Sequence, residues 1–200
     1  MSAIVLIGPP GAGKGTQRER VLKENPEYGF IVPGDIMRAE ISNGTKMGNK
    51  LKEYLNDGLL APHDLVMASI DKHLTEYKRI GKNKIIFDGF PRMLEQAVAI
   101  DQILANYGDE YKIQCVIVFE VSDDNIMKRI HNRSLTSNRA DDKEDTIICN
   151  RIKLYKDNIT PIINHYRGFV YSIDGNADLD TVYESLKEAV NKSLCRSKIS

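Results

Sequence analysis

"GPPGAGKGT", the stretch from Gly8 to Thr16, decides the fold, because it connects a strand to a helix through a turn with four glycines among nine residues. The apolar run Ala3–Ile7 precedes it and is typical of a strand that is covered on both faces of a parallel sheet. Glycines let successive backbone N–H groups face one anion, and the N-terminus of the following helix adds positive charge. The stretch therefore predicts a phosphate-binding loop in which Lys14 reaches the terminal phosphates.

Four more apolar runs follow along the chain, and helical patterns lie between them: Phe30–Val32, Ile85–Phe87, Cys115–Phe119 and Phe169–Ile173. Alternating strands and helices indicate an α/β fold with a five-stranded parallel sheet and right-handed crossovers. Residues 34–78 are too long for one crossover helix, so we expect at least three helices there, broken at Asn43-Gly44 and Asp57-Gly58. A long helix from about residue 143 to 167 is expected to begin at Asp141 and Asp142, where carboxylates favour the helix dipole.

The composition excludes several classes of protein. Lys plus Arg and Asp plus Glu number 28 each in 200 residues, so no overall field favours nucleic acid or an anionic membrane, and any anion site must be built locally. The cysteines Cys115, Cys149 and Cys195 are far apart and predict neither a disulfide framework nor a zinc site. The N-terminal apolar run is too short for a signal peptide or a membrane span. We therefore expect a protein of the reducing cytoplasm.

The phosphate loop departs from the general pattern Gly-x-x-x-x-Gly-Lys-Ser/Thr at one position, because Gly15 follows the lysine and the hydroxyl comes one residue later, at Thr16. This form resembles the loop of the nucleoside monophosphate kinases. The resemblance extends over nearly the whole chain through "GDIMR" (34–38), "DGLLAPHDLV" (57–66), "DGFPRMLEQA" (88–97), "RIHNR" (129–133) and "NRADD" (138–142). The segment at 88–97 is a specific signature, and on it the chain most closely resembles the adenylate kinase family.

This resemblance implies the P-loop nucleoside monophosphate kinase fold, with flanking helices on the five-stranded sheet, in a single kinase domain of residues 1–200. The core would comprise residues 1–33, 62–133 and 140–200, the helical monophosphate-binding insertion residues 34–61, and the short lid residues 134–139. Some members of the family carry a longer lid with a four-ligand metal site. The lid of this chain has no room and no cysteine for such a site, so we expect no protein-held zinc.

The resemblance also implies the reaction, a reversible phosphoryl transfer from MgATP to AMP that gives two ADP and balances the adenine nucleotides. The expected partners are these small molecules, with Mg²⁺ as the cofactor, and the self-contained site predicts a monomer. Two alternatives are left open by the sequence. One is a kinase for another monophosphate, UMP or CMP. The other is a nucleotide-dependent switch or binding module, which would leave Arg38, Arg92 and Gln96 without a role.

Transfer between two phosphorylated nucleotides concentrates negative charge, so the chemistry needs cations more than a base. The resemblance accordingly implies catalytic roles for Lys14, Arg92, Arg133, Arg139, Arg151 and Asp88. Asp88 would position the waters of Mg²⁺, an ion that keeps several waters and takes few carboxylates. The implied ATP site comprises Gly11, Ala12, Gly13, Lys14, Gly15, Thr16, Arg129, Arg133 and Asn176.

The implied AMP site comprises Pro33, Arg38, Leu59, Leu60, Gly89, Arg92, Gln96, Arg139 and Arg151. Two of these positions depart from the family pattern. Pro33 stands where most members have threonine or serine, so one polar contact to the acceptor base is expected to be lost. Arg151 lies one residue further from the Asp141-Asp142 pair than the family arginine, whose place is taken by Asn150. We expect the extra residue at the helix start, with Arg151 still directed at phosphate.

Overall fold

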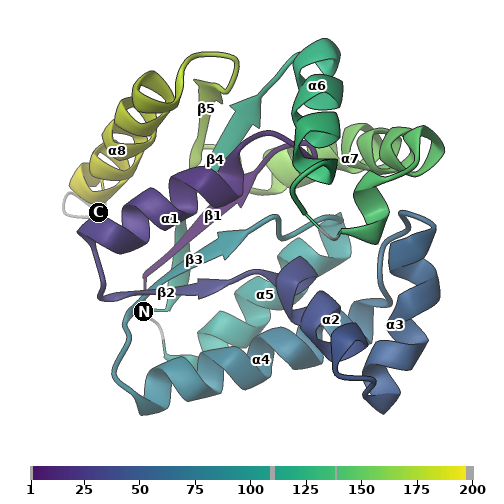
Figure 1. The fold of residues 1–200 in the computed structure, drawn as a ribbon. Coiled ribbons are helices and arrows are strands. Elements are labelled where there is room, and N and C mark those ends of the chain that lie inside the picture. The colour runs from purple at the N-terminus through teal and green to yellow at the C-terminus, as the bar shows by residue number, and fades with distance from the viewer. Residues whose placement is uncertain (1, 109–110, 138, 197–200) are drawn as a thin grey trace.

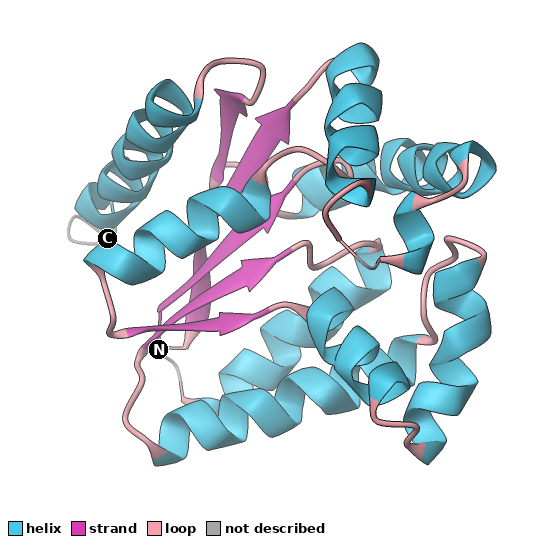
Figure 2. Cartoon of the chain, in the orientation of Figure 1, coloured by secondary structure: helices cyan, strands magenta, loops and turns pink. Residues whose placement is uncertain are grey.

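The computed structural model describes residues 2–108, 111–137 and 139–196, and its centre is a five-stranded parallel sheet (Figures 1 and 2). The strands are β1 Ser2–Ile7, β2 Tyr28–Ile31, β3 Lys84–Asp88, β4 Lys112–Glu120 and β5 Val170–Asp174. Their order across the sheet is β2-β3-β1-β4-β5, and each pairing is parallel. The predicted α/β fold with five parallel strands is thus confirmed, although Val32 lies beyond the end of β2.

Helices separate the strands. They are α1 Lys14–Glu24, α2 Pro33–Ser42, α3 Lys46–Asn56, α4 His63–Arg79, α5 Leu94–Tyr107, α6 Asp123–Ser134, α7 Asp145–His165 and α8 Leu179–Arg196, with a short 3-10 helix, η1, at Ala140–Asp142. Three helices lie between β2 and β3, as expected. The first two end next to the predicted breaks at Asn43-Gly44 and Asp57-Gly58.

The sheet separates two hydrophobic cores, because neighbouring residues of a strand face opposite sides. Ala3, Val5 and Ile7 of β1 belong to the core beneath α4, α5 and α7. Ile4 and Leu6 belong to the core beneath α1 and α8 on the other face. Both faces of β1 are therefore buried, which explains why its sequence is apolar throughout instead of alternating.

The expected start of the long helix at Asp141-Asp142 is wrong. These two residues form η1, and α7 begins only at Asp145, because Glu144 has an extended backbone with φ −119° and ψ 130°. Asp141 and Asp142 are 8% and 1% exposed. Both are bound by arginine side chains, so their carboxylates serve ion pairs and not the end of a helix.

The parallel strands place all their carboxyl ends at one edge of the sheet, where ligands bind in open α/β folds. Figure 1 shows α2 and α3 on one side of this edge, with α6 and the start of α7 on the other. The loop between β1 and α1 lies between them. Segments that are far apart in the sequence therefore come together around the phosphate loop.

Candidate active site

The loop between β1 and α1 needs glycine at two positions for steric reasons. Gly11 and Gly13 have φ of 77° and 89°, in the left-handed region that residues with a Cβ rarely adopt. A Cβ at Gly11 would also lie 2.9 Å from Cγ1 of Ile130 in α6. Gly13 is the N-cap of α1, so the free N–H groups at the start of this helix open toward the carboxyl edge of the sheet. The loop has the geometry of an anion site.

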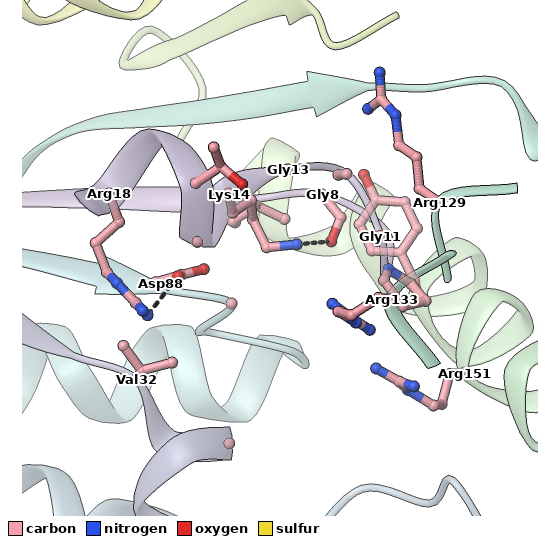
Figure 3. A pocket seen from close by; sticks show the side chains of 18 of the residues that line it. Gly8, Gly11, Gly13, Lys14, Arg18, Val32, Asp88, Arg129, Arg133 and Arg151 are labelled. Atoms are coloured by element: carbon pink, nitrogen blue, oxygen red, sulfur yellow. Dashed lines mark hydrogen bonds and ion pairs between the residues drawn. The ribbon is translucent and has the colours of Figure 1, made fainter. Parts of the chain in front are cut away.

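Lys14 is the first residue of α1, and its amine bends back over the loop (Figure 3). Nζ donates hydrogen bonds to the carbonyl oxygens of Gly8 at 2.8 Å and Pro9 at 3.0 Å. Desolvation lowers the pKa of Lys14 to about 8, against the opposing attraction of Asp88. An anion in the loop would favour the charged amine and raise this pKa again.

A cleft of about 800 Å³ lies along the carboxyl edge, within the range of small-molecule sites. Four carboxylates line its described walls, namely those of Glu19, Asp35, Asp88 and Asp178. Eight cations line them as well: Lys14, Arg18, Arg38, Arg92, Arg129, Arg133, Arg139 and Arg151. Because the chain as a whole has no net charge, this excess of cations is a local feature and favours polyanionic ligands.

Arg133 and Arg151 share one buried carboxylate. Arg133 donates to both oxygens of Asp142, at 2.6 and 2.7 Å, and Arg151 donates to Oδ1 of Asp142 at 2.8 Å. Arg151 also contacts the carbonyl oxygen and the carboxylate of Asp141, at 2.7 and 3.1 Å. Burial alone would raise the pKa of Asp142, but the hydrogen bonds and charges of the two arginines lower it below its ordinary value.

Asp35, in the first turn of α2, joins three arginines from different elements. Its Oδ1 accepts from Arg38 of the same helix and from Arg139 at 3.2 Å, and its Oδ2 lies 3.4 Å from Arg18 of α1. Partial burial would raise the pKa of Asp35, but these three cations lower it. Asp35 therefore connects the two sides of the cleft through residues separated by 104 positions in the sequence.

Arg92 follows the end of β3 and is held against the backbone. Its Nε donates to the carbonyl oxygen of Gly89 at 2.9 Å, and its own N–H donates to Oε1 of Gln96 at 2.8 Å. Desolvation in the cleft, followed by the charges of Arg151 and Arg38, lowers the pKa of Arg92 to about 10. The guanidinium still carries its charge at neutral pH.

The structure brings most of the predicted site residues together. The cleft is lined by Gly11, Ala12, Gly13, Lys14, Gly15, Thr16, Arg38, Leu60, Asp88, Gly89, Arg92, Arg129, Arg133, Arg139 and Arg151. In Figure 3, Lys14, Arg133 and Arg151 point into a common space, whereas the guanidinium of Arg129 extends away from them. Asn150 is exposed and does not line the cleft, whereas Arg151 does.

Four predicted residues lie outside the cleft lining. Pro33 is buried at the start of α2, although its neighbours Val32 and Gly34 line the cleft. Leu59 is 46% exposed, and Gln96 is 2% exposed with its oxygen bound to Arg92. Asn176 is exposed and its Oδ1 accepts from Ser122 and Asn125 at the start of α6. The roles of these four residues, like those of the predicted residues that line the cleft, stay predictions.

Arg18 and Asp35 are charged residues of the cleft lining to which the sequence assigned no role. Arg18 follows Lys14 by four positions, the spacing that places two side chains on the same face of a helix. Asp35 is part of "GDIMR" and precedes Arg38 by three positions, so the same spacing could have indicated their ion pair.

The described residues contain no group of three or more His, Cys, Asp and Glu side chains able to hold a metal ion. In the same residues, no helix is both long and apolar enough to cross a membrane. Cys115 is buried and Cys149 exposed, both as free thiols, while the side chain of Cys195 lies outside the described part. Asn138 of the predicted lid also lies outside the described residues.

The fold and the loop define the class of protein: a glycine loop between the first strand of a parallel sheet and the N-terminus of a helix makes this a P-loop protein. The family model for adenylate kinase matches residues 6–170. An adenylate kinase of Mycolicibacterium paratuberculosis is 39% identical over 189 residues, which cover 94% of this chain and 99% of the relative.

Two further relatives, from distant bacteria, agree. An adenylate kinase of Thermus thermophilus is 35% identical over 192 residues, covering 94% of this chain and 96% of the relative. One of Bacteroides thetaiotaomicron is 37% identical over 196 residues, covering 96% of this chain and 100% of the relative. The chain belongs to the adenylate kinase family.

Proposed function

We propose that this chain catalyses reversible phosphoryl transfer from MgATP to AMP and so forms two ADP. The observation that carries the proposal is the set of eight cations in one cleft of a chain without net charge. A single nucleotide on the phosphate loop would need only part of this set. The arginines across the cleft from the loop support a second phosphorylated ligand that faces the first one.

The donor side is formed by the phosphate loop. Its backbone N–H groups and Lys14 bind the phosphates of ATP, and Arg133 approaches them from α6. Arg129, which extends away from Arg133, is available to stack on the adenine. Asn176 sits beside the start of α6 through its contact with Ser122, where it can border the same base.

The acceptor side is formed by Arg38 and Arg92, which bind the phosphate of AMP. The guanidinium groups of Arg38 and Arg92 lie near the same point of the backbone, at Gly34. A Cβ at Gly34 would lie 3.2 Å from a nitrogen of Arg38 and 3.5 Å from a nitrogen of Arg92. This closeness supports a shared phosphate. Leu60 and Gly89 line the same part of the cleft. Leu59 and Gln96 border the base in this proposal, and Gln96 does so through its amide nitrogen, because its oxygen is already bound.

Catalysis in this arrangement is positioning and charge stabilisation. Lys14, Arg92, Arg133, Arg139 and Arg151 surround the space between the two phosphate sites and stabilise the charge that spreads over the transferred group. Arg139 and Arg151 are held by Asp35 and Asp142, so they approach the phosphates from fixed positions. The carboxylates are thus the frame that orients the catalytic cations.

The residues present fit a hydrated Mg²⁺ that arrives with ATP. Asp88 is a carboxylate, 6% exposed, at the end of β3 on the cleft, and the hydroxyl of Thr16 lines the cleft as well. Oxygen ligands of this kind suit Mg²⁺, which would neutralise phosphate charge when bound. The side chain of Asp88 is itself oriented by Arg18, which donates a hydrogen bond to its Oδ2.

We also propose how the chain is divided and where the protein acts. We place the monophosphate-binding insertion at residues 34–61, the lid at 134–139, and the core of the single kinase domain at 1–33, 62–133 and 140–200. A monomer in the cytoplasm, without nucleic acid or membrane partners, agrees with the balanced charge and with a cleft formed by one chain. No zinc is held by the protein in this proposal.

The test is a coupled assay of ADP formation with MgATP alone and then with AMP, CMP, UMP or GMP added. We expect transfer only with a monophosphate present and the highest kcat/KM with AMP. EDTA should stop the reaction without lowering Tm, and elemental analysis should find no stoichiometric zinc. Another monophosphate with a higher kcat/KM would replace AMP as the acceptor. Hydrolysis of ATP without any acceptor dependence would favour a nucleotide switch instead.

A further inference from the structure

Arg18 is the one cation of the described cleft lining to which the family resemblance gives no role. It lies on α1 four residues after Lys14, so both side chains leave the same face of the helix. Lys14 turns toward the loop carbonyls, whereas the guanidinium of Arg18 extends to the other side, toward Asp88 (Figure 3). The side chain of Arg18 is only 17% exposed, so protein contacts and not solvent determine where its charge lies.

One nitrogen of Arg18 lies between two carboxylates. Nη1 is 3.0 Å from Oδ2 of Asp88 and 3.4 Å from Oδ2 of Asp35. The contact with Asp88 is the shorter one, and the side chain of Asp88 is the more buried of the two, at 7% exposed against 40% for Asp35. A buried carboxylate without a partner is costly, so Asp88 has the greater need of this cation. The contact uses Oδ2 and leaves Oδ1 of Asp88 to other ligands.

We propose that Arg18 is a positioning residue for the donor nucleotide and that it acts through Asp88. Its guanidinium fixes one oxygen of Asp88 and balances the carboxylate charge beside the phosphate loop. The other oxygen would then be placed to accept from a water of Mg²⁺ when the ion arrives with ATP. This proposal rests on the proposed function, because the ligand concerned is ATP with its Mg²⁺.

The charge and the shape of Arg18 have separate consequences. Without its charge, Asp88 repels the phosphates of metal-free ATP, whereas Mg²⁺ bound to the phosphates turns that repulsion into attraction. Loss of the charge therefore weakens the binding of metal-free ATP more than the binding of MgATP. Loss of the planar guanidinium with the charge retained leaves this balance intact but frees the carboxylate to rotate, which lowers kcat.

The experiment measures the dissociation constant of ATP by titration calorimetry, with excess Mg²⁺ and with excess EDTA, on the full chain. In Arg18→Ala, the ratio of the EDTA value to the Mg²⁺ value should rise by roughly three- to tenfold, as expected for one partly exposed charge. In Arg18→Lys, the ratio should stay within about twofold of wild type while kcat falls severalfold. Lys23→Ala removes an exposed cation of the same helix and should change neither quantity.

The same measurement on variants that also carry Asp88→Asn separates an action of Arg18 through Asp88 from other roles of Arg18. In Asp88→Asn, the added Arg18→Ala change should leave the ratio unaltered, because the carboxylate charge is already gone. A rise of the same size in that background would mean that Arg18 acts on Asp35 or on the phosphates, and the proposal would be wrong. An equal rise of both dissociation constants together with a lower Tm would mean that Arg18 has a purely structural role, and the proposal would again be wrong. A wild-type chain that does not bind ATP would overturn the proposed function instead.

Discussion

Lys14, on the phosphate-loop wall of the cleft, and the arginines on the opposite wall are held in different ways. On the wall of the phosphate loop, Lys14 donates only to neutral carbonyls, five and six residues away in the sequence. On the opposite wall, Arg133 and Arg151 are bound by the buried carboxylate of Asp142. Arriving phosphate has no charged group to displace from Lys14, whereas across the cleft it must share its arginines with carboxylates.

This difference predicts which substitutions lower turnover and which lower the stability of the fold. The loop wall contributes a lysine whose desolvation is unfavourable until a phosphate arrives, so its substitution should affect turnover and spare the fold. The arginine wall is a set of mutually compensating charges, so removal of a carboxylate there should affect the fold as well. Substitutions on the two walls therefore test the comparison.

The largest effect is expected for Lys14→Met, which removes the lysine of the loop wall. The loss of one charge-stabilising donor lowers kcat by about a hundredfold or more. Steady-state kinetics with saturating MgATP and AMP give the value. A kcat close to that of wild type would show that the loop wall is not where the transferred phosphoryl group is stabilised.

The same variant has a pH signature in stability. Because the pKa of Lys14 is lowered to about 8 in the folded chain, the folded state pays to keep the amine charged below that pH. Lys14→Met should therefore be more stable than wild type at pH 7, as measured by urea unfolding. This advantage in the free energy of unfolding should shrink as the pH rises from about 8, the pKa of Lys14 in the folded chain, toward about 10.4, the pKa of lysine in the unfolded chain. Between these two values the folded chain has lost the proton of Lys14, whereas the unfolded chain still holds it.

Arg92→Lys tests the region between the walls, where the guanidinium is held by a backbone carbonyl. We expect roughly a ten- to hundredfold loss in kcat/KM for AMP, because lysine cannot make the planar two-pronged contact with phosphate. The surroundings that lower the pKa of Arg92 also disfavour a charged lysine, so the defect should diminish as the pH is lowered. Kinetics across a pH series check both points, and unchanged kinetics would place the acceptor phosphate elsewhere.

The contrast between the walls also explains how far the sequence could predict the structure. The loop wall is local: the run Ala3–Ile7, the glycines and Lys14 are contiguous, and each is recognisable from its own neighbours. The ion pairs of the opposite wall join residues such as Arg139 and Asp35, 104 positions apart, and no local pattern indicates them. The start of α7 differs from the prediction for another reason: Asp142 suits a helix start by residue type, but its carboxylate is bound by Arg133 and Arg151, each nine positions away.

Asp142→Asn tests the arginine wall. The side chain of Asp142 is fully buried, and its charge is shared by Arg133 and Arg151, of which Arg151 keeps a second carboxylate in Asp141. The free energy of unfolding should fall by about 1–3 kcal/mol at pH 7. Because the folded pKa of Asp142 is lowered, its contribution is present above the unfolded value near 3.9 and is lost as the pH falls through the folded value. The difference in the free energy of unfolding between variant and wild type should thus narrow as the pH falls below about 3.9.

The matched control is Asp178→Asn, an exposed carboxylate of the cleft lining that accepts from the N–H groups of Asp180 and Thr181 at the start of α8. Asparagine caps a helix about as well as aspartate, so this substitution removes the charge and keeps the cap. It should leave stability nearly unchanged between pH 7 and about pH 4. If Asp142→Asn were equally neutral, the carboxylates would be incidental to the arginine wall, and the two walls would not differ as described.

The smallest effect is expected for Pro33→Thr, at the edge where α2 begins. Proline suits the first position of this helix, where no N–H is needed, but it offers the acceptor base neither a hydroxyl nor an N–H. One neutral hydrogen bond is worth about 0.5–1.5 kcal/mol, so a restored hydroxyl should lower the KM for AMP a few-fold and leave kcat almost unchanged. Pro33 is buried between Val32 and Gly34, which line the cleft, so position 33 borders the proposed site of the base. Pro33→Ala is the control for altered backbone freedom, since it removes the ring without adding a hydroxyl. An equal fall of KM in both variants would attribute the change to the backbone of α2, and the predicted contact between position 33 and the acceptor base would be wrong.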